Sequence, residues 1–109
     1  MDAMTLREIC DSLEVSRRAV QGYEKVGLVK PTGKTERGHL LYDERMQERI
    51  KEIRLFQQIG FTRKEIAEII DASSDIRRVA LERQLIRLKK KKEDVEALIQ
   101  EVYRLIEKS

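Results

Sequence analysis

TLREICDSLEVSRRAVQGYEKVGLVKPTGKTERGHLLY, residues 5–42, is the stretch that decides the fold. The apolar residues of its first part are spaced i, i+3, i+4, i+7, as on one face of a helix: Leu6, Ile9, Cys10 and Leu13. Thr5 and Glu8 have the spacing of a capping box, in which a hydroxyl and a carboxylate satisfy free N–H groups at the helix start. The residues after Thr5 therefore predict a short helix that ends near Leu13.

A second short helix follows after a tight turn. Ser16 is a favourable N-cap, and the apolar residues after it again mark one face: Ala19, Val20, Tyr23 and Val26. Gly27 stands where a helix end favours glycine, because glycine adopts the left-handed conformation without strain. Two short helices with a tight turn make a helix-turn-helix.

The outer face of the second helix is polar and its beginning is basic. The second helix of a helix-turn-helix enters the DNA major groove by its N-terminal residues. Here those residues are Arg17 and Arg18, with Gln21 one turn later. Arginine pairs with guanine or phosphate and glutamine with adenine, so this pattern predicts DNA binding.

A basic hairpin is predicted after the helix-turn-helix. Residues 28–30 and 40–42 are predicted to be short extended runs, and the loop between them includes Pro31 and two glycines. Such a hairpin is a wing, and Lys34 and Arg37 would present positive charge on it.

Two further helices are predicted next. Asp43 caps the third, whose apolar face comprises Met46, Ile50, Ile53, Phe56 and Ile59. Gly60 ends it, and Thr62 with Glu65 forms a second capping box before a fourth helix. The start of that helix, with Arg63, is either a phosphate-binding site or ordinary capping.

The last part of the chain predicts one long helix that ends near Lys108. Its seam alternates steps of four and three residues, as in a coiled coil: Leu81, Leu85, Leu88, Lys92, Val95, Ile99, Val102 and Ile106. Only Lys92 interrupts the apolar pattern. At 1.5 Å per residue the helix would reach about 50 Å, longer than a small domain, so we expect it to form a homodimer.

Composition excludes several classes of protein. The chain has 109 residues, a net charge of +3, one cysteine and one histidine. A lone cysteine forms no internal disulfide or cysteine-clustered metal site, and Cys10 on an apolar face is interpreted as a small core residue. No apolar run is long enough for a membrane helix. The sequence has no glycine-rich phosphate loop or catalytic cluster, so an enzyme is not expected.

Positive charge is concentrated in the decisive stretch. Residues 16–37 contain six basic and two acidic residues, an excess of four, although the whole chain has an excess of only three. A basic patch on one face is typical of nucleic-acid binders. A solvated surface would give the same count, so charge alone leaves both interpretations open.

Residues 4–70 resemble the DNA-binding region of the MerR family of bacterial transcription regulators. The matching motifs are TLREI at 5–9, Val15-Ser16, YEKVGLVKP at 23–31, Gly38 with Tyr42, and IGFT at 59–62 leading to Glu65-Ile66. The long seamed helix resembles the dimerisation helix of that family. The resemblance implies a winged-helix homodimer, held by an antiparallel coiled coil, on a near-palindromic promoter element.

The resemblance also implies roles for single residues. Arg18 falls on a DNA-contacting arginine, Tyr23 on a tyrosine that contacts backbone phosphate, and Arg63 at the start of a second wing. The chain departs from the family where arginine then tyrosine are frequent, with Gln21 and Gly22. It departs again after the wing glycine, where His39 and Leu40 replace tyrosine and arginine.

Gly22 lies inside the predicted second helix, where glycine costs about 1 kcal/mol relative to alanine. It leaves room there for a close approach to the backbone. His39, the only histidine, has no cysteine or carboxylate cluster near it in sequence. It is interpreted as a wing residue and not as a metal ligand or a base.

Cysteines that metal-sensing relatives carry around the dimer helix are absent here, so no thiolate metal site is expected. Drug-sensing relatives have a separate C-terminal effector domain, which residues 1–109 do not include. The chain is therefore either a short regulator or a piece of a longer protein, and the sequence leaves this open.

We thus predict a mostly α protein: a winged helix-turn-helix domain at 1–72 and a dimerisation helix at 73–109. The predicted DNA-binding residues are Thr5, Arg17, Arg18, Gln21, Tyr23, Lys34, Arg37, His39, Tyr42, Thr62 and Arg63. The predicted dimerisation residues are Leu81, Leu85, Leu88, Val95, Ile99, Val102 and Ile106.

The predicted function is that of a cytoplasmic, sequence-specific transcription regulator without a cofactor or metal. Its expected partners are double-stranded DNA and a second copy of itself, with RNA polymerase as a further candidate and no membrane. The alternatives are a coiled-coil adaptor and an excisionase-like architectural factor. Activation or repression, the operator and any effector are not indicated by the sequence.

Overall fold

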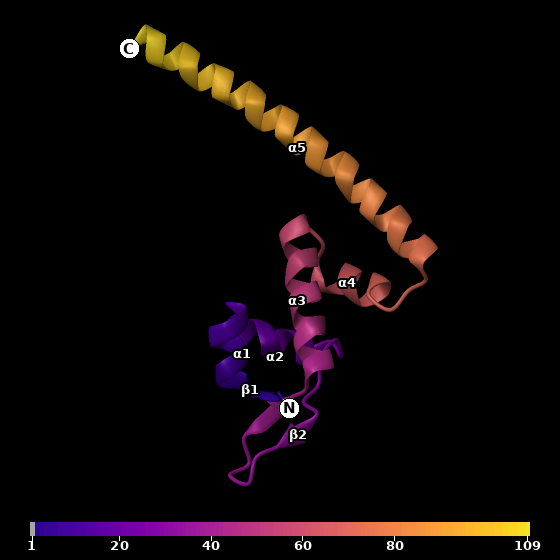
Figure 1. Ribbon diagram of the computed structural model, residues 1–109. Helices are drawn as coiled ribbons and strands as arrows, with labels where there is room; N and C mark the ends of the chain where they lie inside the picture. Colours follow the sequence, from indigo (N-terminus) through magenta and orange to yellow (C-terminus); the bar gives the residue numbers. More distant parts are fainter. Residues whose placement is uncertain (1) are drawn as a thin grey trace. The chain divides into compact units, whose positions relative to one another are not determined.

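The computed structural model describes residues 2–109, which form five helices and three short strands (Figure 1). In chain order they are β1 Met4–Thr5, α1 Leu6–Leu13, α2 Arg17–Lys25, β2 Gly33–Lys34, β3 Leu40–Tyr42, α3 Glu44–Ile59, α4 Arg63–Ile69 and α5 Ser74–Lys108. The described chain divides into two compact units, one ending at Ala72 and the other beginning at Ser73. This confirms a winged helix-turn-helix followed by a long helix.

The helix ends confirm the predicted caps. The Thr5 hydroxyl accepts from the backbone N–H of Glu8 at 3.3 Å, and the Glu8 carboxylate accepts from the N–H of Thr5 at 2.9 Å. Thr62 and Glu65 form the same capping box before α4. Ser16 and Asp43 cap α2 and α3 by accepting from the backbone N–H three residues later. Local side-chain chemistry therefore sets where each of these helices begins.

The turn between α1 and α2 is held from a distance. Glu14 adopts the left-handed conformation with φ 52° and ψ 46°, which is unfavourable for a residue with a Cβ atom. From α3, the Arg54 guanidinium donates to the carbonyl oxygens of Leu13, at 2.7 Å, and of Glu14. These bonds satisfy carbonyls that the end of α1 leaves free and fix the turn that sets the direction of α2.

Glu14→Val is expected to destabilise the protein by about 1–2 kcal/mol, because a β-branched side chain is disfavoured in the left-handed region. Urea unfolding at one fixed protein concentration would measure the loss. Glu14→Asn is the matched control, since asparagine tolerates this conformation, and it should leave stability unchanged or slightly higher. Equal losses in both variants would instead show that the Glu14 carboxylate contributes the stability.

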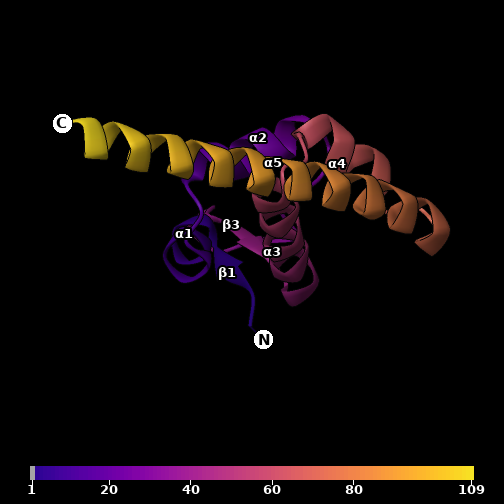
Figure 2. The same cartoon turned by 90° about the horizontal axis from the view of Figure 1, so that it is seen from above.

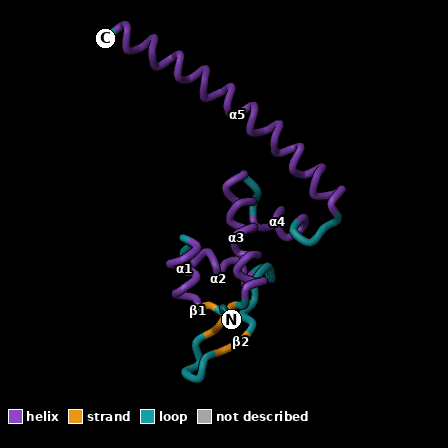
Figure 3. Tube along the Cα trace, viewed as in Figure 1, coloured by secondary structure: helices purple, strands orange, loops and turns teal. Residues whose placement is uncertain are grey.

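The three strands form one antiparallel sheet in the order β1-β3-β2. Met4 pairs with Tyr42 and Gly33 with Leu41, and the loop at the tip of the wing joins β2 to β3 (Figure 3). The prediction that residues 28–30 form the first strand of the hairpin was wrong, because Gly33–Lys34 pairs with β3 instead. Strand β1 was not predicted, since two residues carry no periodic signal.

The core of the first unit lies between the helices and the sheet, and α1 and α3 both pack against β3 (Figure 2). Its fully buried large side chains are Tyr23, Tyr42, Ile9, Ile50, Ile53, Ile66 and Val20. Leu28 and Val29 are also buried, which explains the apolar run that was predicted as a strand. Phe61, in the loop before α4, packs edge-on against Phe56 with ring centroids 5.8 Å apart. Ile66 and Ile69 of α4 are buried, so α4 contributes to this core as well.

Helix α5 is one uninterrupted helix of 35 residues, capped by Ser73. Its seam residues are exposed: Leu85 is 50%, Ile99 45% and Ile106 63% accessible. Ion pairs at helical spacing, Lys90 with Asp94 and Arg104 with Glu101, lie along it. Such a long apolar stripe on one helix is available for a partner helix.

Candidate nucleic-acid interface

Helix α2 separates its buried residues from its basic ones. Val20 and Tyr23 are buried at 0% and 1% accessibility. Arg17, Arg18 and Gln21, in the first half of the helix, are exposed. The cap at Ser16, the core contacts of the helix and the clamp on the preceding turn all fix this orientation. Three side chains that can pair with bases or phosphates therefore face solvent together.

The wing presents its charges on a hydrogen-bonded turn. The N–H of Gly38 donates to the carbonyl of Thr35 at 2.9 Å, and the N–H of Thr35 donates to the carbonyl of His39 at 2.8 Å. Gly38 has a φ of +86°, which explains the glycine at this position. Lys34, Arg37 and His39 are exposed on this hairpin.

The wing and the helix-turn-helix meet at a shared hollow of about 480 Å³. Thr5 lines it from the end of β1, Arg17 from α2, and Gly38 and His39 from the wing. Residues predicted from three separate segments are thus brought together, with the positive charge of Arg17 beside the wing tip.

Arg63, the first residue of α4, lies against α2. Its guanidinium carbon lies 5.8 Å from the centroid of the Tyr23 ring, which is the distance of a cation–π contact. Arg63 remains exposed, and the Thr62 hydroxyl before it accepts from the N–H of Glu65 at 3.1 Å. The Thr62 hydroxyl is therefore engaged in capping the helix, and the exposed Arg63 side chain presents a positive charge to solvent.

Two of the predicted DNA contacts belong to the core instead. Tyr23 and Tyr42 are 1% and 0% exposed. The Tyr23 hydroxyl donates to Oε1 of Gln57 at 2.7 Å, and the Tyr42 hydroxyl donates to Oε2 of Glu24 at 3.2 Å. We correct their assignment, since a buried and hydrogen-bonded hydroxyl is not presented to a phosphate. Both rings instead connect α2 to its neighbours.

The environment of these phenols keeps them neutral. Burial raises the pKa of Tyr23. Burial first, and then the adjacent Glu24 carboxylate, raises the pKa of Tyr42 to about 12. The Tyr42–Glu24 bond therefore joins a neutral phenol to the Glu24 side chain and ties β3 to α2.

Two arginines of α3, Arg49 and Arg54, support α2 and were not predicted from the sequence. Arg54 clamps the turn before α2, as described above. Arg49 donates through Nε to the carbonyl of Leu28, just after α2, and through Nη1 and Nη2 to the Asp71 carboxylate at 2.8 and 2.9 Å. Their partners are distant in sequence, so no local pattern could reveal them.

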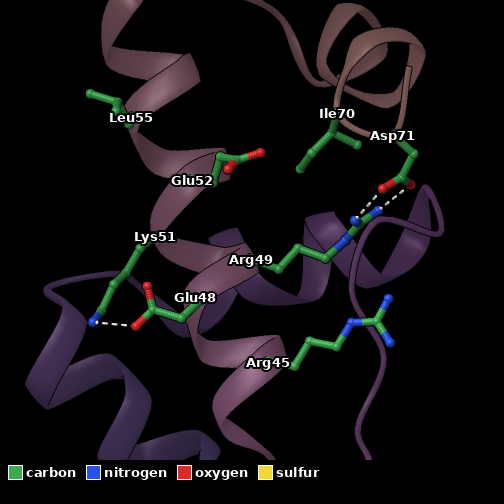
Figure 4. A pocket seen from close by; sticks show the side chains of 8 residues that line it. All are labelled: Arg45, Glu48, Arg49, Lys51, Glu52, Leu55, Ile70 and Asp71. Atoms are coloured by element: carbon green, nitrogen blue, oxygen red, sulfur yellow. Dashed lines mark hydrogen bonds and ion pairs between the residues drawn. The ribbon is translucent and has the colours of Figure 1, made fainter. Parts of the chain in front are cut away.

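Figure 4 shows this Arg49–Asp71 pair at a hollow of about 450 Å³, with the ion pair of Lys51 and Glu48 on the same helix. Three basic and three acidic side chains line the hollow, and two ion pairs lie among them. The Arg49–Asp71 pair therefore connects α3 to the end of the first unit, and the mixed charges of the hollow do not favour a ligand of one sign.

Residues 2–109 contain no grouping of three histidine, cysteine or acidic side chains that could hold a metal ion. Within the same residues, no helix is long and apolar enough to cross a membrane.

Comparison with known proteins gives consistent matches. A family described as "MerR HTH family regulatory protein" matches residues 4–73. The HTH-type transcriptional activator mta of Bacillus subtilis is 32% identical over 101 residues, which are 93% of this chain and 39% of that protein. The chain thus spans well under half the length of this relative.

Two solved structures share the fold. The crystal structure of MtaN, the N-terminus of the Bacillus subtilis multidrug transporter activator, has a TM-score of 0.74 at 31% identity and covers 94% of this chain and 97% of that chain. A MerR-family transcriptional regulator from Bacillus cereus has a TM-score of 0.77 at 27% identity, over 91% of this chain and 76% of that one. These matches give no support to the adaptor or excisionase-like alternatives.

Proposed function

We propose that this chain, which belongs to the MerR family of helix-turn-helix regulatory proteins, binds promoter DNA as a homodimer and regulates transcription. It acts by binding and not by catalysis, in the cytoplasm, with RNA polymerase as a second partner at the promoter. The assignment of residues up to Ala72 to DNA and of residues from Ser73 to dimerisation is part of the same proposal.

The observation that carries the proposal is the exposed face of α2. Arg17, Arg18 and Gln21 lie on the first half of a helix whose other face is buried. A recognition helix contacts base edges with these same positions. The wing adds Lys34 and Arg37, which suit the phosphates beside the groove because such contacts position the protein without reading sequence.

The exposed seam of α5 supports the homodimer. In a single copy the apolar stripe of α5 from Leu81 to Ile106 is exposed. Two copies would bury their stripes against each other. A two-fold dimer binds two half-sites, so the operator would be near-palindromic. The antiparallel direction of the pair follows from the family and is proposed with it.

The test is fluorescence-anisotropy binding to duplexes from the promoter of the protein's own gene and to a scrambled duplex, over a range of salt concentrations. We expect tighter binding to a promoter duplex, two protomers per duplex, and a steep fall in affinity with salt because phosphate contacts release counterions. Equal and weak binding to every duplex would contradict the proposal and favour a protein partner for α5.

Arg18→Ala is expected to cost roughly 1–3 kcal/mol of binding free energy and to relax preference at one base pair of each half-site. The reason is that Arg18 is exposed in the first turns of α2, where a base edge is within reach of a recognition helix. Anisotropy titrations against duplexes with single base-pair changes would measure this.

Lys51→Ala is the matched control, since it removes an exposed positive charge outside the proposed interface. It should change neither affinity nor base preference. If Arg18→Ala weakened all duplexes alike, Arg18 would contact phosphate and another residue would read the base. If it changed nothing, α2 would not be the recognition helix.

A further inference from the structure

Gly22, in the middle of α2, leaves a space that Arg63 of α4 occupies. A Cβ atom built on Gly22 would lie 2.5 Å from Nη1, 2.6 Å from Cζ and 2.9 Å from Nη2 of Arg63. Contacts under 3.0 Å are not found for real Cβ atoms, so any side chain at position 22 would displace the guanidinium. The missing side chain thus leaves the space that the Arg63 guanidinium fills.

That position is on the exposed face of α2. Gly22 follows Arg18 by four residues and precedes Lys25 by three, and residues at this spacing share one side of a helix. Arg18 and Lys25 are both exposed. Gly22 therefore lies between two basic residues of the face that the proposed function assigns to DNA, and the Arg63 guanidinium lies against the backbone of α2 at this point.

Two further interactions hold the Arg63 guanidinium in this position beside Gly22, which we call its seat. The Tyr23 ring lies 5.8 Å from Cζ of Arg63, and this ring is itself held by its hydroxyl bond to Gln57. The capping box of Thr62 and Glu65 fixes the backbone immediately before Arg63. Only the end of the arginine side chain would have to move if position 22 carried a side chain.

We infer that Gly22 is a positioning residue that seats Arg63 beside the recognition helix, where the guanidinium contacts a DNA backbone phosphate. This inference rests on the proposed function. Gly22 is the sixth residue of α2, and the N-terminal residues of a recognition helix enter the groove. A charge beside its middle therefore faces the edge of the groove, where the phosphates lie. Arginine suits that site because its planar fork binds phosphate oxygens in pairs.

The binding test compares wild type, Gly22→Ala, Arg63→Ala and the double variant on promoter and scrambled duplexes over a salt series. Each single variant should bind both duplexes about tenfold more weakly, as expected for one lost charge-assisted contact. The slope of log affinity against log salt should fall by about one unit. The double variant should bind as Arg63→Ala does, because the alanine at position 22 then has no guanidinium to displace.

Stability separates this role from simple packing. Alanine favours a helix more than glycine does, and only a flexible side-chain end must move. The melting temperature of Gly22→Ala should therefore be equal to that of wild type or higher while its DNA affinity falls. A loss of affinity that followed a loss of melting temperature would overturn the inference.

Nuclear magnetic resonance tests the seat without DNA. The Nε–H signal of Arg63 should be shifted by the Tyr23 ring in wild type and should move toward its ordinary position in Gly22→Ala. If the signal is ordinary in wild type, the seat does not exist and the inference falls.

The binding data separate the remaining outcomes. If Gly22→Ala weakens binding equally in the Arg63→Ala background, the new methyl group clashes with DNA directly and the inference is also overturned. A wild-type protein with a shifted Arg63 signal but no preference for any promoter duplex would overturn the proposed function, whereas the seat itself would stand.

Discussion

Ile99→Asp is expected to convert the protein to a monomer and to weaken promoter binding by about a hundredfold or more. Ile99 lies in the middle of the apolar seam of α5 and is 45% exposed in one copy. In the proposed dimer it would be buried against the partner helix, and each copy would bring one aspartate into that apolar interface. A buried carboxylate without a partner is strongly unfavourable, and two copies double the effect.

The loss of DNA affinity follows from the loss of the second half-site. A dimer gains from simultaneous engagement of both half-sites, and that gain commonly exceeds a factor of about 100. Sedimentation velocity would measure the oligomeric state, anisotropy the affinity, and circular dichroism the helix content of the variant.

Ala97→Asp is the matched control for this experiment. Ala97 lies two residues before Ile99 on the same helix, is exposed, and falls opposite the seam. The same charge there should leave the dimer intact. A dimeric Ile99→Asp variant would refute the assignment of the seam, whereas a monomeric Ala97→Asp variant would show that the helix pairs through another face.

The helix boundaries were predictable because they depend on residues close in sequence. A capping box needs only Thr5 and Glu8, and each partner is three residues from the other. The same holds for Thr62 with Glu65. The core residues of α3 and α4 were predictable for the same reason, because apolar residues at helical spacing indicate which face of a helix is buried.

The wing was harder to predict because its strands depend on partners far away. Gly33–Lys34 has little intrinsic preference for a strand, and its pairing is set by β3 and by the turn at Gly38. Leu28 and Val29 have the composition of a strand, but side-chain packing alone buries them. A burial signal in a short segment does not distinguish these two cases.

The candidate interface was predicted in part. The helical period of α2 predicts which of its residues are exposed, and it also places Tyr23 on the buried face. The Tyr23 hydroxyl bonds to Gln57, which is far away in sequence. The motif therefore indicated a phosphate contact where the structure has a core residue. The sequence indicated that another group could approach the backbone closely at Gly22. No sequence pattern identified that group as Arg63, which lies 41 residues later.

Arg49→Ala is expected to destabilise the protein by about 3 kcal/mol, the second large effect. Arg49 is 23% exposed and donates to the carbonyl of Leu28, a residue that is 4% exposed. Without the guanidinium this buried acceptor loses its partner, which costs about 1–3 kcal/mol, and hydrogen bonds to a charged group are lost as well. Urea unfolding at one fixed protein concentration would measure the loss, because dimerisation makes stability concentration-dependent.

Asp71→Ala distinguishes the carbonyl from the ion pair. The Asp71 side chain is 74% exposed, so solvent screens its attraction to Arg49 and its removal should cost less than about 1 kcal/mol. Arg49→Lys keeps the positive charge, but a lysine ammonium lacks the planar guanidinium fork that contacts Leu28 and Asp71 together. The loss of stability in Arg49→Lys should therefore be close to that in Arg49→Ala. Losses in Asp71→Ala as large as in Arg49→Ala would instead assign the stability to the ion pair. Leu28 lies three residues after the last residue of α2, so that result would also mean that the Arg49–Leu28 bond is not what holds the end of α2 against α3.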